Sequence, residues 1–311
     1  MTFLPDSAVP PGRLAVGVVL PSPAVQRAQK LGLADAARHA EQAGLDLVSH
    51  GDRPAGGAAS PDAAVALATA AGATGRVTVV GGVGVPALRP LALAARRIAS
   101  LQHVADGRLV LGVEPGGGRE QWAAAGVPYE ERGRRTDSAL RLLPRLLAGE
   151  PVPLPYEASG AEAGPVPAVP VPPVWIGGNS PTAIRRAARL GDGWFPSLAP
   201  SAEVAEGAVR LAELAVVHGR KLPVVAVGTT GVLGTEPGLP GRADIAARLA
   251  AAHGSPAGRF VDVPVTGGLQ EAAERLHSYC GAGVSRILMR FAGGDWRHQV
   301  DLLADVRTLL R

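Results

Sequence analysis

Short apolar segments alternate with longer segments of helical periodicity along most of the chain. The first apolar segment, residues 14–20, is nearly continuous, which is typical of a strand that is buried on both faces. Similar segments predict further strands at 45–49, 76–85, 108–113, 174–176, 193–195, 222–227 and 285–291. Apolar spacing predicts helices at 33–43, 61–73, 90–101, 133–147, 181–190, 201–218, 243–252, 268–280 and 297–310, with Ser60 as the N-cap of the second.

This alternation predicts the fold class. Strands that are each followed by a helix form a parallel sheet with helical crossovers. Eight such units favour an α/β fold of the (β/α)8 TIM-barrel type. A doubly wound sheet would usually carry Gly-x-Gly-x-x-Gly at its first turn, and none follows Leu20. The segment 228–267 fits the repeat least well.

The same pattern sets the domain boundaries. We expect residues 1–13 to be a flexible N-terminal tail and residues 14–311 to be one barrel domain. Residues 149–173 are rich in Pro, Gly and Ala and are predicted to form an irregular insertion.

Composition narrows the class of protein. Cys280 is the one cysteine, so the chain forms no internal disulfide and offers a zinc ion no set of thiolates. The sequence also contains no His-x-His or His-Glu-x-x-His, and we expect no metal site. The net charge of +4 comes from scattered arginines with only 4% aromatic residues, which favours a solvated surface over a nucleic-acid interface. No apolar run approaches the ~18 residues of a membrane span, and no secretory leader is recognisable, so a cytoplasmic protein is expected.

A turn between two predicted elements has the features of a phosphate site. The strand 174–176 ends in Gly177 and Gly178, and Asn179 and Ser180 then offer an N-cap for a helix that begins at Pro181. Backbone N–H groups at a helix N-terminus attract anions. A tight turn without a ligand remains the alternative.

Other strand ends carry candidate chemistry, because active sites in this fold lie at the carboxyl ends of the strands. His50 and Asp52 follow the second strand, and Glu114 follows the fourth, where Gly116 is a candidate for cofactor binding. His50 and Glu114 are candidates for proton transfer, and the alternatives are a loop histidine and a loop salt bridge. The glycines around Gly82 and Val83 at the end of the third strand favour a bulge or a strained peptide that a flat ring could approach.

The order of these pieces resembles the bacterial-luciferase-like monooxygenase superfamily. The resemblance rests mainly on Trp175-Ile176-Gly177-Gly178-Asn179-Ser180-Pro181, on the later Arg189-Leu190-Gly191-Asp192-Gly193-Trp194-Phe195, and on Ala105-Asp106-Gly107-Arg108. It implies a (β/α)8 barrel that binds FMN or the deazaflavin F420. It also implies that Gly177, Gly178, Asn179 and Ser180 hold the cofactor phosphate, and that Gly82 and Val83, near a non-proline cis peptide of the family, lie behind the ring.

The chain differs from the family at two strand ends. Where members usually have Ser-Asp-His, this chain has Ser49-His50-Gly51-Asp52, and Glu114-Pro115 interrupts the family's Leu-Gly-Val-Gly pattern. These differences keep a non-catalytic flavin-binding or partner-subunit homologue open as an alternative function.

The leading hypothesis is an oxidoreductase that uses F420 to transfer a hydride to or from a small organic substrate, with His50, Asp52 and Glu114 as catalytic candidates. F420 is placed ahead of FMN because the Arg-rich, Ala/Gly/Pro-heavy composition resembles actinobacterial proteins, in which F420 is common. The alternatives are an FMNH2-dependent monooxygenase and, from a different class, a barrel isomerase or lyase that binds a substrate phosphate at Gly177–Ser180. A homodimer is expected by family analogy only.

Overall fold

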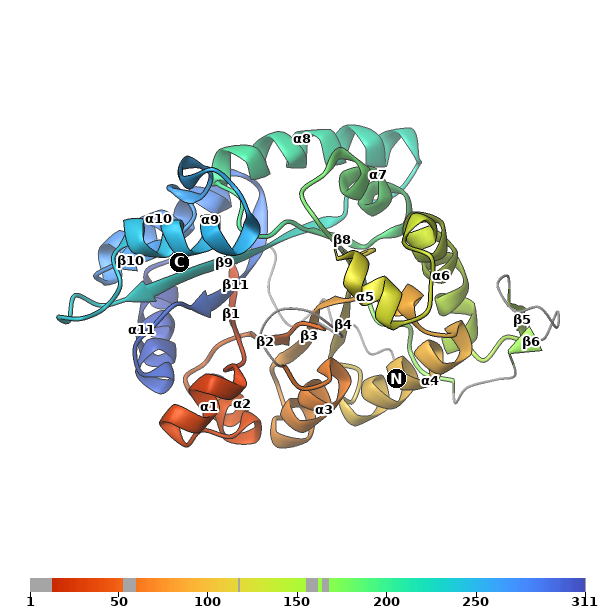
Figure 1. Ribbon diagram of the computed structural model, residues 1–311, viewed down its shortest axis with the longest axis horizontal. Coiled ribbons are helices and arrows are strands. Elements are labelled where there is room, and N and C mark those ends of the chain that lie inside the picture. Colours follow the sequence, from red (N-terminus) through yellow and green to blue (C-terminus); the bar gives the residue numbers. More distant parts are fainter. Residues whose placement is uncertain (1–12, 53–59, 117, 155–161, 164–167, 311) are drawn as a thin grey trace.

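Eight parallel strands close into a barrel in the computed structural model, which describes residues 13–52, 60–116, 118–154, 162–163 and 168–310 (Figure 1). Around the barrel the strands are β1 (Ala15–Val19), β2 (Leu47–His50), β3 (Thr78–Gly84), β4 (Leu109–Val113), β7 (Val174–Gly177), β8 (Gly193–Phe195), β9 (Val224–Leu233) and β11 (Val284–Phe291). Strand β9 pairs with both β8 and β11, and β11 pairs with β1, which completes the circle. The predicted (β/α)8 TIM barrel is therefore confirmed.

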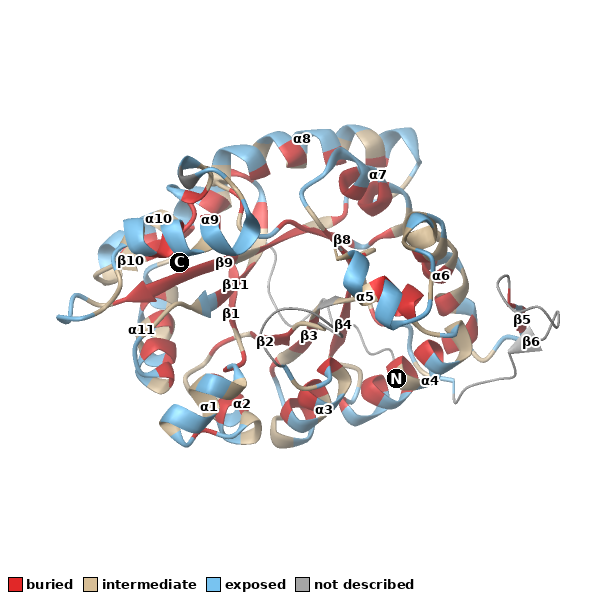
Figure 2. Cartoon of the chain, viewed as in Figure 1, coloured by how far each residue is buried: buried red, intermediate tan, exposed pale blue. Residues whose placement is uncertain are grey.

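Helices surround this barrel and present their buried sides to it (Figure 2). The longer ones are α2 (Leu33–Gln42), α3 (Ala63–Ala73), α4 (Leu91–Val104), α6 (Arg132–Leu147), α7 (Pro181–Leu190), α8 (Ser201–Val217), α9 (Arg242–His253), α10 (Leu269–Gly281) and α11 (Trp296–Leu309). All of these match predicted helices to within a few residues. The apolar periodicity of these segments was strong enough to predict both that each helix forms and where it lies in the sequence.

Several short elements were not predicted. They are α1 (Pro23–Gln29), α5 (Arg119–Ala124), β10 (Val265–Gly267), the short 3-10 helices η1 (Pro86–Leu88), η2 (Tyr129–Glu131) and η3 (Ala257–Phe260), and a two-stranded sheet of β5 (Val152–Pro153) and β6 (Glu162–Ala163). The last lies within the predicted insertion. The predicted tail, residues 1–13, lies outside the described residues except for Arg13, whose guanidinium is 3.6 Å from the Asp46 carboxylate.

The prediction of Ser60 as an N-cap was wrong. The cap of α3 is Asp62, whose Oδ1 accepts hydrogen bonds from the N–H groups of Ala64 and Val65 at 2.9 and 3.3 Å. A carboxylate two residues later replaces the serine, because its charge also suits the positive end of the helix dipole. Ser60 is thereby available to contact His50.

Side chains of the strands divide between two apolar clusters. Alternate residues point into the lumen and form its floor, which consists of Ala15, Leu47, Val80, Val110, Trp175, Phe195, Ala226 and Leu288. The residues between them, such as Val48 and Val113, pack against the helices in the larger cluster. This division follows from the two-residue repeat of a strand and decides which side chains reach the site.

The opposite end of the barrel is held by carboxylates that accept backbone hydrogen bonds. Asp46 Oδ2 accepts from Val16 N–H at 3.0 Å, and Asp192 Oδ2 accepts from Val174 N–H at 2.9 Å. Arg307 donates two further bonds to the Asp46 carboxylate, at 2.9 and 2.7 Å. These contacts fix the amino ends of the strands and leave the carboxyl ends to carry the site.

We expect Gly17→Ala to reduce the free energy of unfolding by about 1–3 kcal/mol, the usual cost of overpacking. A Cβ at Gly17 would lie 2.3 Å from the carbonyl oxygen of Leu47 on the neighbouring strand, so the two strands would have to separate. The control is Gly72→Ala on the exposed side of α3, where a Cβ meets nothing within 4 Å. This substitution should raise the free energy of unfolding by about 0.5–1 kcal/mol, because alanine favours the helix over glycine. Urea denaturation measures the free energy of unfolding of both variants. Equal values for Gly17→Ala and Gly72→Ala would contradict the packing described.

Candidate active site

The lumen above its floor is lined largely by backbone. Two residues beyond each floor residue, towards the carboxyl ends of the strands, stand Gly17, Gly82, Gly112, Gly177 and Gly228, which we call the glycine layer. Ser49, Ser197 and Arg290 occupy the corresponding positions beyond the floor residues of β2, β8 and β11. A glycine layer lets a flat ring approach the strands more closely than side chains would permit.

The end of β3 contains a bulge. Gly81 pairs with Leu111 and Gly84 pairs with Val113, so Gly82 and Val83 together oppose one residue of β4, Gly112. The bulge expected from the glycine run is thus present. A Cβ on Gly82 would lie 2.3 Å from Ser49 Oγ and 3.5 Å from a ring carbon of Phe195, which places Gly82 on the lumen side.

Neighbouring residues at the end of β2 face opposite sides of the barrel wall. Ser49, 1% exposed, points into the lumen against Gly82. His50, 5% exposed, lines a pocket of about 80 Å³ between the barrel and helices α3 and α4, together with Leu67 and Ile98. The structure therefore places the predicted histidine outside the lumen wall, and it places there a serine that the sequence reasoning did not select.

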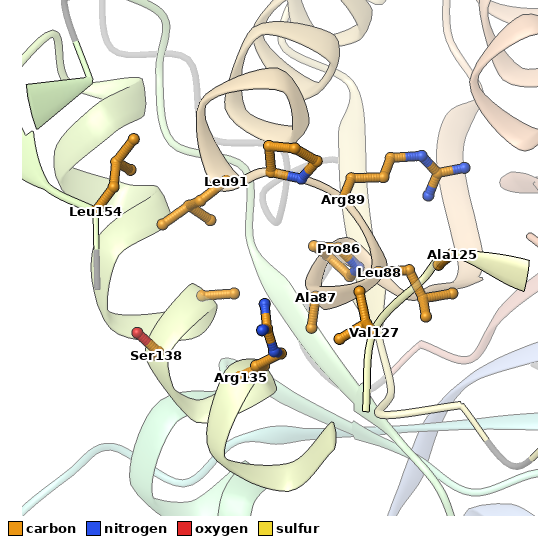
Figure 3. A pocket seen from close by; sticks show the side chains of 12 residues that line it. Pro86, Ala87, Leu88, Arg89, Leu91, Ala125, Val127, Arg135, Ser138 and Leu154 are labelled. Carbon is orange, nitrogen blue, oxygen red and sulfur yellow. The ribbon is translucent and has the colours of Figure 1, made fainter. Parts of the chain in front are cut away.

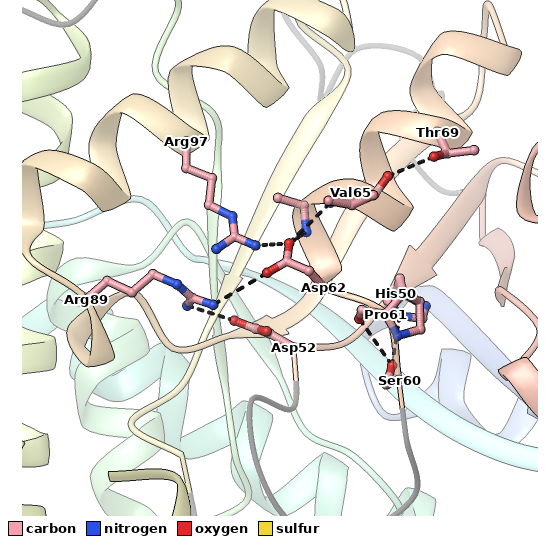
Figure 4. A network of polar contacts seen from close by, with 10 residues as sticks. His50, Asp52, Ser60, Pro61, Asp62, Val65, Thr69, Arg89 and Arg97 are labelled. Carbon is pink, nitrogen blue, oxygen red and sulfur yellow. Dashed lines mark hydrogen bonds and ion pairs between the residues drawn. The ribbon is translucent and has the colours of Figure 1, made fainter. Parts of the chain in front are cut away.

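His50 is buried with only part of its hydrogen-bonding capacity used. Its Nε2 lies 3.1 Å from Ser60 Oγ, while its Nδ1 is buried and has no hydrogen-bond partner among the described residues (Figure 4). Burial is the main cause that lowers the pKa of His50, and it outweighs the carbonyl of Pro61, which raises it. Among nearby charges, Arg290 lowers this pKa and Asp52 raises it. Folding thus shifts the proton equilibrium of His50 towards the neutral imidazole.

Asp52 belongs to a chain of ion pairs. Its carboxylate accepts a hydrogen bond from Arg89 Nη1 at 3.0 Å, and Arg89 Nη2 lies 3.8 Å from Asp62. Asp62 also pairs with Arg97 of α4 while it caps α3 (Figure 4). The network ties the segment after β2 to the start of α3 and to α4, which gives Asp52 a structural role.

Glu114 and Gly116 follow β4 and have different surroundings. The N–H of Glu114 donates to Gly84 O at 3.0 Å, which continues the ladder past the bulge, and strand alternation from Val110 places Glu114 on the lumen side. Gly116 is buried at φ +69°, where its nearest side chains are those of Gln121, Val85 and Trp122. Strand alternation therefore assigns Glu114 to the lumen, whereas Gly116, predicted to bind the cofactor, forms a turn that is packed against these side chains.

The turn after β7 has the predicted geometry. Gly178 has φ +111°, and Ser180 caps α7 by accepting a hydrogen bond from Ala183 N–H at 3.2 Å. The Asn179 side chain is bonded to the backbone of Ser197, donating to its carbonyl at 2.9 Å and accepting from its N–H at 3.0 Å. Asn179 and Ser180 are exposed, so the start of α7 is accessible to an anion while the turn itself is held rigidly.

The Gly178 backbone is also fixed. Its N–H donates to Phe195 O at 3.3 Å, and its carbonyl accepts from Trp194 Nε1 at 2.9 Å. Gly178 therefore shapes the turn, and the side-chain oxygens of Asn179 and Ser180 are already used. An anion bound here would depend on backbone N–H groups at the helix start and on the dipole of α7.

Other kinds of site find no support in the described part of the chain. Within it, no group of three or more His, Cys, Asp or Glu side chains is arranged to hold a metal ion. Searching the same residues also finds no helix of the length and apolar character that crossing a membrane requires.

The fold and this site define a barrel of the luciferase-like type. The model of the luciferase-like monooxygenase family matches residues 14–305, and the chain belongs to this family. The solved structures it resembles include an F420-dependent secondary alcohol dehydrogenase in complex with an F420-acetone adduct, with a TM-score of 0.79 at 16% identity over 96% of this chain and 99% of that one. A type II Baeyer-Villiger monooxygenase of Pseudomonas putida in complex with FMN gives a TM-score of 0.75 at 16% identity over 94% and 97%.

Curated relatives match in part. An F420-dependent glucose-6-phosphate dehydrogenase of Beutenbergia cavernae is 38% identical over 168 residues, which is 50% of this chain and 49% of that protein. An uncharacterized protein of Mycobacterium tuberculosis is 33% identical over 111 residues, 35% of this chain and 38% of that one. The chain thus matches about half, or less, of the length of these relatives.

We expect the stability of the protein to rise from pH 5 to pH 7 partly through His50. Because its pKa is lowered in the folded state, the unfolded chain binds the proton more readily, and stability grows as the pH rises towards the ordinary histidine pKa of about 6.5. His50→Gln should show a smaller gain in urea-denaturation free energy over this range. His277→Gln, at an exposed position on α10, is the control. Equal gains in wild type and His50→Gln would contradict the assignment.

Proposed function

We propose that this protein is an F420-dependent oxidoreductase that transfers a hydride to or from a small organic substrate. The observation that favours F420 over FMN is the 38% identity, over half of this chain, to an F420-dependent glucose-6-phosphate dehydrogenase. The structural likeness to an F420-dependent alcohol dehydrogenase and to an FMN-dependent monooxygenase concerns the fold and fits either cofactor. FMNH2-dependent oxygenation is therefore the second candidate.

The described residues fit such a cofactor. The glycine layer leaves backbone around the upper lumen, and the bulge at Gly82 and Val83 provides a wall against which a flat ring would lie. The start of α7, at Asn179 and Ser180, would hold a phosphate through backbone N–H groups, with Gly177 and Gly178 shaping the approach. When bound, F420 supplies a ring carbon that accepts or donates the hydride.

The side chains around the lumen would bind substrate and handle the accompanying proton. Glu114 is proposed as the acid or base, because it follows the lumen-facing positions of β4. Ser49 would offer a hydroxyl at the level of the glycine layer, and Phe195 and Trp175 close the floor with ring centroids 5.8 Å apart. His50 and Asp52 would act indirectly. His50 would fix the position of Ser49, its neighbour on β2, and Asp52 would orient Arg89 through their hydrogen bond.

The non-catalytic alternative is favoured by one observation. Of the three predicted catalytic residues, His50 faces helices α3 and α4 and Asp52 is ion-paired to Arg89, so strand alternation assigns Glu114 alone to the lumen side. Cofactor binding and turnover must therefore be measured separately.

The first experiment titrates the purified protein with F420 and, separately, with FMN, following fluorescence. We expect F420 to bind in the micromolar range and Ser180→Asp to weaken it at least tenfold, because aspartate keeps the helix cap but repels a phosphate. Ser180→Asn, which also caps but is neutral, is the control and should bind within about threefold of wild type. Binding of FMN alone would select the second candidate, and binding of neither would contradict a redox function.

Turnover is tested with Glu114→Gln and reduced or oxidised F420 on a panel of small alcohols and ketones. We expect kcat to fall by about 10²–10⁴, as for loss of a general acid or base, while the Kd for F420 stays unchanged. Glu120→Gln on the exposed start of α5 is the control. If wild type binds F420 but turns over no member of the panel, the non-catalytic homologue becomes the better description. If Glu114→Gln retains full kcat, Glu114 does not carry the proton.

A further inference from the structure

A second pocket lies between the segments that follow β3 and β4. It has a volume of about 210 Å³ and is bordered by η1, the start of α4, the segment after α5 and one face of α6 (Figure 3). It shares no residue with the glycine layer or with the turn at Gly177–Ser180. We call it the loop pocket.

The walls of the loop pocket are mainly apolar. They are formed chiefly by Ala87, Leu88, Leu91, Val127, Ala139 and Leu154. Ala87, Leu88, Ala139 and Leu154 are buried, so these walls belong to the packed structure and do not depend on exposed loop tips. Such walls favour a hydrocarbon body in the ligand.

One cation enters this apolar space. The guanidinium of Arg135 points from α6 into the loop pocket in Figure 3, and its side chain is 22% exposed. Glu131, one helical turn earlier, accepts a hydrogen bond from Arg135 Nε at 2.7 Å and so fixes the direction of the side chain. Glu131 is not itself part of the lining, and none of the described lining residues is acidic.

The second arginine of the lining is directed elsewhere. Arg89 turns towards Asp52 and Asp62 and forms ion pairs with both in the network described above (Figure 4). Arg135 is also paired, with Glu131 through Nε, but its guanidinium lies within the loop pocket, and a planar guanidinium has further donors that match a carboxylate.

We propose that the loop pocket binds a small amphiphilic carboxylate, with the hydrocarbon against η1 and α4 and the carboxylate at Arg135. A cavity of about 150 Å³ accommodates benzene, so this pocket suits a chain or ring of roughly eight carbon atoms. The ligand would contact η1, which directly follows the bulge of β3, and α6, which follows β4. The proposal for this pocket does not rest on the cofactor or on the proposed hydride transfer.

Octanoate is the probe, and isothermal titration of the full chain without added cofactor is the measurement. We expect a Kd below 1 mM for octanoate and at least tenfold weaker binding of 1-octanol, which has the same chain without the charge. Arg135→Met should weaken octanoate at least tenfold while it keeps an apolar side chain of similar reach. Arg134→Met is the matched control, because Arg134 also pairs with Glu131, at 2.9 Å, but is 69% exposed, and it should bind within twofold of wild type.

A measurement on the unmodified sequence guards against a variant that fails to fold. Nuclear Overhauser contacts from octanoate to isotope-labelled leucine methyls should involve Leu88, Leu91 and Leu154. Contacts confined to other leucines, no binding at 10 mM, or equal affinities of wild type and folded Arg135→Met would each overturn the proposal. None of these measurements uses F420 or FMN, so a negative result here would not contradict the proposed function. Failure of the cofactor titration would likewise not contradict the proposal for the loop pocket.

Discussion

Closure of parallel strands into a barrel imposes one constraint on everything else in this protein: each strand must give alternate side chains to the lumen and to the helices. Ser49 and His50 show its force. They are adjacent in sequence, yet one contacts Gly82 inside the barrel and the other lies against α3 and α4 outside it. The glycine layer follows from the same rule, since it collects residues spaced by two from the apolar floor. The register of each strand therefore determines which residues face the lumen, and the types of those residues then determine the available chemistry.

The sequence was sufficient for the barrel because the signals that specify it are local. Continuous apolar runs marked β1 and β4, helical periodicity marked α6 and α8, and the Ser180-Pro181 pair marked the start of α7. Where two local signals competed, the prediction failed: Ser60 and Asp62 are both good N-caps, and the charged Asp62, which also suits the helix dipole, caps α3. Short elements such as α1 and β10 carry too few residues for a periodic pattern.

The candidate site was predictable only in its backbone. The turn at Gly177–Ser180 and the bulge at Gly82 and Val83 were expected from glycines and a capping serine, and both are present. Side-chain roles depend on contacts distant in sequence. Arg89 reaches Asp52 across 37 positions, and no spacing rule could have indicated it. Ser49 could have been found by extending the alternation from Leu47. The roles of His50, Asp52 and Glu114 in catalysis stay predictions.

The bulge in β3 has a consequence for how this chain tolerates changes in length. Before the bulge, odd-numbered residues of β3 such as Val79 face the surrounding helices, as does the paired Leu109 of β4. After the bulge, the even-numbered Gly84 pairs with Val113, which also faces the helices. One extra residue has thus reversed the inside-outside assignment for all that follows, including the approach to η1. Removing one residue here would turn that segment over as a whole, whereas most single replacements would alter one contact. At this point of the barrel the number of residues is a stricter requirement than their identity.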